Sequence, residues 1–313
     1  MKKGRRPEAR EHGAELDGGL VVRGHGRHYL VQTDDGGRVQ CVPRGKKSEA
    51  VVGDRVRWAP TSPGEGVIEA IEPRRNLLYR QDEWRSKSFA ANVDQLLVLV
   101  AVEPVFSESL LARALVAAAE AGIASCVALN KTDLPSAALA RERLSPYSVM
   151  GVRVMELALK RDPAAALALL GPWLAGKTTV VLGPSGTGKS TLTNLLVPDA
   201  RAQVGEISTA LNSGRHTTTH TQWYALPGHL GGGAWMDSPG FQTFGIQQIE
   251  PMRLAALMPD LAELAPQCRF ANCTHRAEPA CAVRAALEAG RVPASRYRIY
   301  LELFEELSRP PQY

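Results

Sequence analysis

GPSGTGKST, at residues 183–191, decides the fold of this chain. It matches the phosphate-loop pattern G-x-x-x-x-G-K-[ST], with the apolar run TTVVL before it and a helix-forming run, TLTNLLV, from Thr191 onward. Glycines allow backbone N–H groups to surround phosphates, while Lys189 reaches the β and γ oxygens and Ser190 can bind Mg²⁺. We expect a nucleoside triphosphate to contact Gly183, Pro184, Ser185, Gly186, Thr187, Gly188, Lys189, Ser190 and Thr191.

Strand and helix patterns alternate around this loop, through roughly residues 90–245. The runs VDQLLVLVAV (93–102) and IASCVALN (123–130) are almost continuously apolar, which is typical of buried parallel strands. Between them, SESLLARALVAAAEAG predicts a helix that begins after Ser107 and ends at Gly122. The alternation predicts an α/β fold with a doubly wound sheet.

NKTD, at Asn130, Lys131, Thr132 and Asp133, follows the second of these strands and indicates the base. The Asp133 carboxylate can accept hydrogen bonds from guanine N1–H and N2–H₂. Adenine lacks that amino group and presents an acceptor at N1, so the carboxylate would stay unpaired. Together with the phosphate loop, the tetrapeptide predicts guanine specificity.

DSPG supplies a third element, with Asp237 placed to reach Mg²⁺ and the Gly240 N–H placed to meet the γ-phosphate. In ordinary small GTPases the phosphate loop comes first, then Asp-x-x-Gly, then Asn-Lys-x-Asp. Here NKTD precedes the phosphate loop. The order predicts a circularly permuted P-loop GTPase domain, a change that a sheet tolerates when its ends lie close together.

The flanking regions predict two further domains. Residues 1–18 are polar and predict a basic flexible tail, and the short strand patterns of residues 19–88 predict an OB-type β-barrel that binds RNA. The 18 Lys and Arg and 13 Asp and Glu of residues 1–88 account for the whole net charge of +5. Residues 72–89 read as a charged linker or a nucleic-acid-facing edge. The GTPase domain then spans residues 89–245, and a helical zinc-binding domain spans 246–313.

CRFANCTHRAEPAC places Cys268, Cys273, His275 and Cys281 in one short stretch. Three thiolates and one imidazole satisfy tetrahedral Zn²⁺ and leave no position for a reacting water, so we predict one structural zinc ion. The other two cysteines, Cys41 and Cys126, lie in predicted strands and are interpreted as small packing residues.

NKTD, GPSGTGKST, GRHTTTHT (214–221), DSPG and the cysteine pattern together resemble the RsgA (YjeQ) family of ribosome-biogenesis GTPases over nearly the whole chain. The resemblance implies an OB-fold, a permuted GTPase domain and a zinc domain. It also implies GTP hydrolysis stimulated by the small (30S) ribosomal subunit during late maturation, with binding to the subunit and its rRNA. At one position the chain departs from the family, because Leu157 and Ala158 stand where a Ser-Ala pair usually lies beside the guanine.

Phe241 stands where many nucleotide hydrolases place a glutamine that orients water, and its side chain has neither donor nor acceptor. His216 is our candidate for that role, because an imidazole can hold a water near pH 7; an exposed loop histidine is the alternative, and His220 is a less favoured candidate. One of Thr217, Thr218 and Thr219 should supply a hydroxyl to Mg²⁺. The missing glutamine predicts slow hydrolysis by the isolated protein.

Two other functions stay open. One is a GTP-gated RNA-binding module in which hydrolysis is incidental, and the other is a nucleoside or small-molecule kinase, against which NKTD and DSPG argue. The sequence contains neither a long apolar run nor a signal-like start, so we expect a cytoplasmic protein that binds GTP and GDP and contacts no membrane. We also expect a monomer.

Overall fold

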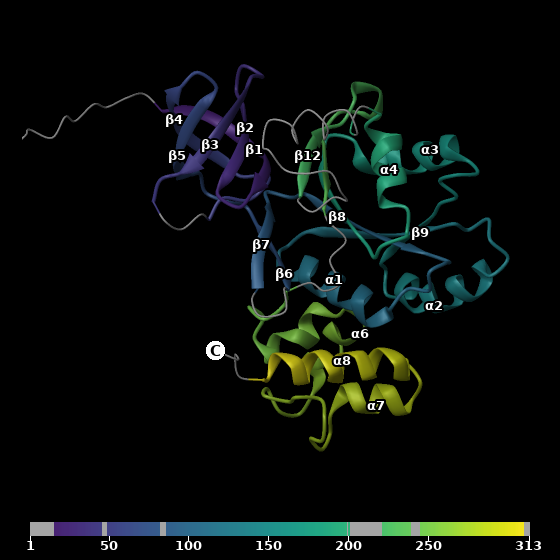
Figure 1. Cartoon of the computed structure of the whole chain (residues 1–313). Coiled ribbons are helices and arrows are strands. Elements are labelled where there is room, and N and C mark those ends of the chain that lie inside the picture. Colours follow the sequence, from purple (N-terminus) through teal and green to yellow (C-terminus); the bar gives the residue numbers. More distant parts are fainter. Residues whose placement is uncertain are drawn as a thin grey trace, which may run out of the picture.

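The computed structural model describes residues 16–45, 49–81, 86–198, 200, 221–238 and 245–309. A β-barrel, an α/β sheet and a group of C-terminal helices follow one another along the chain (Figure 1). None of the helices in the described ranges is long and apolar enough to span a membrane.

The barrel consists of five strands, and its order β1-β2-β3-β5-β4 is closed by pairing between β1 and β4. This confirms the small β-barrel predicted from the sequence. Its interior holds two aromatic side chains, Tyr29 and Trp58, which are therefore core residues. The strands are β1 (Asp17–His25), β2 (His28–Thr33), β3 (Arg38–Pro43), β4 (Arg55–Ser62) and β5 (Glu65–Ile71).

A two-stranded hairpin, β6 (Leu77–Gln81) and β7 (Ser86–Ala91), connects the barrel to the α/β sheet. The sequence suggested a charged linker or a nucleic-acid-facing edge for residues 72–89, and the described part of this segment contains the two strands of the hairpin. The predicted boundary between residues 88 and 89 falls inside β7. Asn76 fixes the hairpin to the next segment, because its side chain bonds both the N–H and the carbonyl of Val93.

The α/β sheet has the order β10-β9-β8-β11-β13-β12, in which the first five strands are parallel and β12 is antiparallel. β8 is buried along its whole length because helices cover both faces, which explains its continuous apolar sequence. The strands are β8 (Gln95–Ala101), β9 (Ala124–Asn130), β10 (Arg153–Glu156), β11 (Thr178–Leu182), β12 (Gln222–Ala225) and β13 (Ala234–Asp237).

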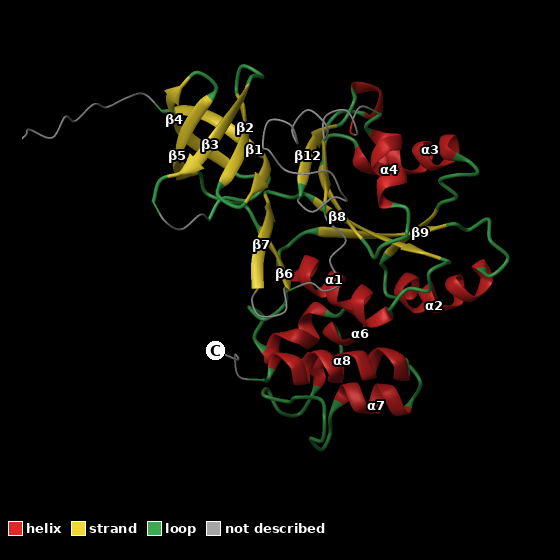
Figure 2. Ribbon diagram, in the orientation of Figure 1, coloured by secondary structure: helices red, strands yellow, loops and turns green. Residues whose placement is uncertain are grey.

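Helices α3 and α4 cover one face of this sheet and α1 and α2 cover the other (Figure 2). Ser107 begins α1 as predicted, because its hydroxyl accepts a hydrogen bond from Leu110 N, and Gly122 follows its end with φ +65°. The helices are α1 (Glu108–Glu120), α2 (Ala137–Val149), α3 (Pro163–Leu174), α4 (Lys189–Leu196) and the 3₁₀ turn η1 (Gly228–Leu230).

The C-terminal helices lie beyond α1 on the same side of the sheet (Figure 1). They share one hydrophobic core with it, since Tyr300 and Phe304 belong to the same buried cluster as Leu111 and Val98. Arg113 on α1 also donates hydrogen bonds to Glu306. The elements are η2 (Pro251–Leu257), α6 (Pro259–Ala262), η3 (Ala265–Gln267), α7 (Ala282–Glu288) and α8 (Ala294–Leu307).

Candidate functional site

Three predicted motifs meet at one edge of the α/β sheet. NKTD begins with the last residue of β9, the phosphate loop follows β11, and Asp237 is the last residue of β13. Because β9, β8, β11 and β13 are neighbours and parallel, their carboxyl ends lie side by side. The strand order reverses at β8, because β9 lies on one side of it and β11 on the other, and doubly wound sheets bind ligands at such a point.

Two glycines of the phosphate loop are required by close backbone contacts. A Cβ atom at Gly183 would lie 2.1 Å from the Leu99 carbonyl oxygen. Gly188 has φ +105°, and a Cβ there would lie 2.4 Å from Asn130 Nδ2. No other residue fits either position without displacing backbone or Asn130, so the pattern of glycines follows from packing as well as from phosphate contact.

Lys189 points into the phosphate loop, where its Nζ donates hydrogen bonds to the carbonyl oxygens of Gly183 (2.6 Å) and Pro184 (2.8 Å). Burial lowers the pKa of this amine, and nearby Asp237 opposes that effect. The phosphate loop therefore holds the ammonium group of Lys189 at its centre. When a nucleotide binds, phosphate oxygens would accept the hydrogen bonds that the two carbonyl groups accept here.

Asn130 connects NKTD to the phosphate loop and to the loop after β10. Its Nδ2 donates to the Thr187 carbonyl (2.8 Å), and its Oδ1 accepts from Leu159 N (3.1 Å). Thr132 also bonds the Leu157 carbonyl through its N–H (3.1 Å) and its hydroxyl (3.0 Å). Asn130 and Thr132 thus bind backbone groups of the loop at Leu157. These bonds do not depend on the Ser-Ala side chains that the family usually has there. Asp133 is exposed at this edge.

Asp237 is almost fully buried at the end of β13. Burial raises the pKa of its carboxyl to about 6, while a hydrogen bond from Thr193 and the charge of Lys189 lower it. Thr193 is itself held by Trp235, whose Nε1 donates to its hydroxyl (3.0 Å). A buried carboxylate beside a lysine suits a metal ion with phosphate, and Ser190 is exposed at the start of α4 on the same face.

The remaining predicted residues of this site lie outside the described part of the chain. They are His216, Thr217, Thr218, Thr219, His220, Gly240 and Phe241.

Cys268, Cys273, His275 and Cys281 come together, with their ligand atoms all within 4.8 Å of one another. His275 Nδ1 lies 3.4 Å from Cys268 Sγ and 3.5 Å from Cys281 Sγ, and these two sulfurs are 3.9 Å apart. A tetrahedral zinc site with Zn–S near 2.3 Å and Zn–N near 2.0 Å has edges of roughly 3.5–3.8 Å. The cluster could therefore hold a metal ion, and its donor set and spacing fit zinc.

Neighbouring side chains shape the loop that carries this cluster. The Glu278 carboxylate accepts hydrogen bonds from Thr274 N (2.8 Å) and the Thr274 hydroxyl (2.6 Å), and from the N–H groups of Arg276 and Ala277 (3.1 Å each). From α8, Tyr297 and Tyr300 donate to the carbonyls of His275 (2.7 Å) and Thr274 (2.9 Å) respectively. The metal loop is thus tied to the helix that packs on α1.

Cys41 and Cys126 are fully buried and lie apart from this cluster, in β3 and β9. Burial raises the pKa of the Cys41 thiol to about 11 and that of Cys126 to about 12. Both remain protonated near neutral pH, which agrees with their interpretation as packing residues.

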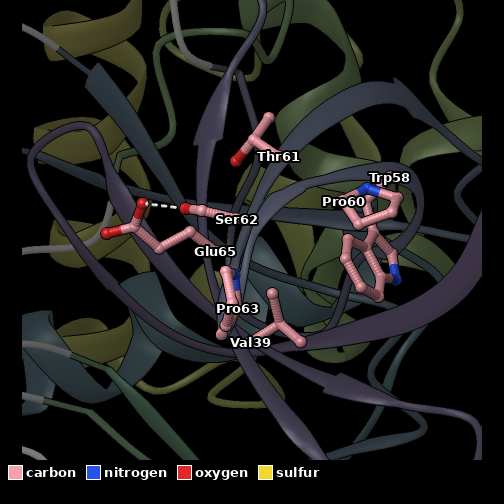
Figure 3. A pocket seen from close by; sticks show the side chains of 8 residues that line it. Val39, Trp58, Pro60, Thr61, Ser62, Pro63 and Glu65 are labelled. Atoms are coloured by element: carbon pink, nitrogen blue, oxygen red, sulfur yellow. Dashed lines mark hydrogen bonds between the residues drawn. The ribbon is translucent and has the colours of Figure 1, made fainter.

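A cavity of about 360 Å³ lies at one end of the barrel, away from the nucleotide motifs (Figure 3). Trp58, Val39 and two prolines line it, and the Ser62 hydroxyl donates to the Glu65 carboxylate at 2.6 Å. An apolar surface beside a carboxylate does not favour phosphate binding. This cavity is therefore no part of the nucleotide site.

The arrangement at the sheet edge defines the class of protein. A phosphate loop, an Asn-Lys-x-Asp turn and a buried Asp at the end of a strand, in permuted order on a doubly wound sheet, are the parts of a circularly permuted GTPase, an enzyme that hydrolyses GTP. The RsgA GTPase family model matches residues 71–247, and the chain belongs to this family.

Relatives match almost the full length of the chain. A protein of Variovorax paradoxus named "Small ribosomal subunit biogenesis GTPase RsgA" is 57% identical over 299 residues, covering 94% of this chain and 93% of the relative. A Paraburkholderia phytofirmans protein of the same name is 52% identical over 311 residues, covering 98% of each.

Solved structures confirm the permuted fold. YjeQ from Thermotoga maritima aligns with a TM-score of 0.70 and 31% identity, covering 94% of this chain and all of that one. YloQ, described as a circularly permuted GTPase, aligns with a TM-score of 0.68 and 28% identity over 98% of this chain and all of that one.

Proposed function

We propose that this protein is a ribosome-stimulated GTPase that acts in late maturation of the small (30S) ribosomal subunit. It binds the subunit and its rRNA in the GTP state and is released after hydrolysis, as a cytoplasmic monomer. The observation that carries the proposal is the set of guanine and phosphate motifs at one sheet edge, between a barrel in the basic N-terminal part and a cysteine-rich loop. The names of its relatives support the small subunit as the partner.

In this proposal GTP binds with Mg²⁺ across the motif edge. Asp133 receives guanine N1–H and N2–H₂, Lys189 neutralises the β and γ oxygens, and Ser190 and Asp237 hold Mg²⁺ directly or through water. Mg²⁺ held by these residues would supply positive charge to the phosphoryl group that is transferred. One structural Zn²⁺ at Cys268, Cys273, His275 and Cys281 holds the C-terminal loop in shape.

Stimulation by the partner follows from Phe241. Because phenylalanine cannot orient water, another group must do so, and we propose His216. Ordering of residues 214–221 around GTP on a large partner would then raise the rate through positioning and electrostatic stabilisation. The same missing glutamine favours the second candidate function, a GTP-gated RNA-binding module in which hydrolysis is incidental.

Phosphate release from GTP tests both functions. We expect the purified protein to be slow alone and at least about 10-fold faster with small subunits, because general acid–base groups contribute roughly 10²–10⁴-fold once positioned. His216→Ala should lose this stimulation, whereas His229→Ala, which changes another histidine that is exposed in the same sheet domain, should keep it. Large subunits and free RNA are the comparison partners.

The results separate the candidates. No stimulation by any partner contradicts the enzyme proposal and favours the gated module. Stimulation that persists in His216→Ala retains the enzyme and removes His216 from the water-orienting role. Phosphate transfer to an acceptor other than water would indicate a kinase.

Base specificity is tested with Asp133→Asn. The introduced amide donates where the carboxylate accepted, so guanine N2–H₂ would face another donor, whereas xanthine presents a carbonyl there. We expect GTP affinity to fall about 5- to 150-fold and XTP affinity to rise above it, because a polar group that the bound base buries without a partner costs roughly 1–3 kcal/mol. The measurement is competition against a fluorescent guanine nucleotide. Glu142→Gln, at an exposed carboxylate of α2, is the matched control; unchanged GTP preference in Asp133→Asn would contradict the assignment.

A further inference from the structure

Arg23 lies on β1 at the seam between the barrel and the α/β sheet. Among the described residues it forms the one residue pair of the β1–β12 ladder, opposite Gln222 on β12. Beyond this pair β1 and β12 separate, and Trp223 packs against Val22 and Leu30 on the barrel. One arginine thus occupies the point at which the barrel strand continues the GTPase sheet into an 11-stranded sheet.

Arg23 also lies in one cross-strand row, the residues directly opposite one another on adjacent strands, with Asp237, the candidate magnesium ligand. Gln222 pairs with Arg23 on one side and with Asp237 on the other. Residues directly opposite one another in a sheet point to the same face. That face is the one covered by α4, which begins with Lys189. Neighbouring strands are about 4.8 Å apart, so the Cα atoms of Arg23 and Asp237 are roughly 10 Å apart.

The guanidinium of Arg23 is buried, and no carboxylate of the described residues is paired with it. The residue is 7% exposed, and Nε and Nη1 have no hydrogen-bond partner among the residues that the structure describes. Burial lowers the pKa of Arg23 and Tyr224 opposes the effect, yet tyrosine is neutral at pH 7 and arginine stays protonated.

The carboxylates of Asp54 and Asp237 are engaged with other residues. Asp54, which lies in the turn that packs on β1, forms a bidentate pair with Arg74 at 2.7 Å. Asp237 interacts with Thr193 and Lys189. A buried charge without a partner is strongly unfavourable, so a site that retains one is suited to an anion that arrives from outside.

We propose that Arg23 binds the γ-phosphate of GTP, so that the barrel contributes a cation to the nucleotide site. Three observations favour this anion over an RNA phosphate: Arg23 is closed off from solvent, it shares a row with Asp237, and it shares a face with Lys189. As charge spreads over the phosphoryl oxygens during hydrolysis, a fixed guanidinium stabilises it without reorganisation. GDP lacks the group that Arg23 binds.

If Arg23 binds the γ-phosphate, the conformation of the barrel depends on whether GTP or GDP is bound. A partner that shifts β1 would move Arg23 relative to the nucleotide, and by linkage GTP would change the affinity of the barrel for that partner by the same factor. The assignment concerns the nucleotide alone, and it holds or fails whether or not the partner is the small ribosomal subunit.

The test uses the full-length protein with Arg23→Met, which removes the charge at similar length, and Arg23→Lys, which keeps it. Arg38→Met, at an exposed arginine on β3 of the same barrel, is the control for the change in net charge. Four quantities are measured: affinity for a non-hydrolysable GTP analogue, affinity for GDP, affinity for small ribosomal subunits and their RNA, and the midpoint of thermal unfolding without nucleotide.

For Arg23→Met we expect about 10- to 100-fold weaker binding of the GTP analogue, the loss typical of a hydrogen bond to a charged group, with unchanged GDP affinity. Its unfolding midpoint should be equal to or above that of the unmodified protein, because the uncompensated charge is gone. Arg23→Lys should retain part of the preference for the GTP analogue over GDP. If Arg23→Met fails to fold, the affinities of Arg23→Lys are used for the test.

Three results would overturn the proposal. Equal losses of GTP and GDP affinity would make Arg23 a structural residue of the seam. Unchanged affinities with a raised midpoint would mean that it contacts no phosphate of the nucleotide. A loss confined to binding of RNA or of ribosomal subunits would assign it to an RNA phosphate instead.

Discussion

Lys189→Ala is expected to lower the kcat/KM for GTP by roughly 10²–10³, which is the loss seen when one preorganised charge-stabilising group is removed from an active site. Lys189 Nζ is surrounded by the carbonyl groups of Gly183 and Pro184 at the centre of the phosphate loop. Without the amine, the loop keeps its shape and presents backbone dipoles but has no cation for the β and γ oxygens. Phosphate release under saturating Mg²⁺ measures the effect.

The control for this variant is Lys177→Ala. Lys177 is exposed and precedes β11, so it belongs to the same strand but lies at the end opposite the phosphate loop. It should hydrolyse GTP at the rate of the unmodified protein, and both variants should unfold at similar temperatures. Hydrolysis by Lys189→Ala within a few-fold of normal would contradict the role given to the loop.

The GTPase sheet was predictable because its signals are local. β8 and β9 are buried apolar runs, α1 begins at a serine cap, and the phosphate loop and NKTD each follow a strand. A parallel sheet places the ends of such strands side by side, so motifs distant in sequence meet without any further information. The order of the motifs alone was enough to predict the permutation.

Other features depend on partners that are distant in sequence. The β6–β7 hairpin is polar and lacks a clear period, and it forms where Val52 bridges Ala90 and Asn76 bonds Val93. The C-terminal region was predicted as a separate domain, yet its core continues into the sheet through Tyr300 and α1. No local sequence pattern identifies Arg23 as a functional residue, because its position beside Gln222 depends on how the barrel packs against the sheet.

Removal of zinc is expected to unfold the C-terminal loop and to destabilise the whole chain. Structural zinc contributes about 10–16 kcal/mol of binding free energy in small metal-dependent folds, which is comparable to the roughly 5–15 kcal/mol that keeps an ordinary domain folded. Cys273 and Cys281 belong to the same buried cluster as Tyr300 and Val98. Loss of the metal therefore acts on the core that α8 shares with the sheet.

Chelation and Cys273→Ser should each lower the unfolding temperature, and limited trypsin digestion should locate the change. Arg269 and Arg276 are exposed within the loop, where a metal would restrain the backbone around them. We expect cleavage after these two residues to become at least about 10-fold faster once the restraint is lost, because a protease acts on the locally opened state. Zinc added back after chelation should restore the slow rate.

Cys126→Ala is the matched control, since Cys126 is equally buried but lies in β9, apart from the cluster. It should keep one zinc per chain and the slow digestion, at the modest cost of a small cavity. If Cys273→Ser retained full zinc content and resisted trypsin, Cys273 would not be a ligand of the metal, and its buried thiol would be a packing group.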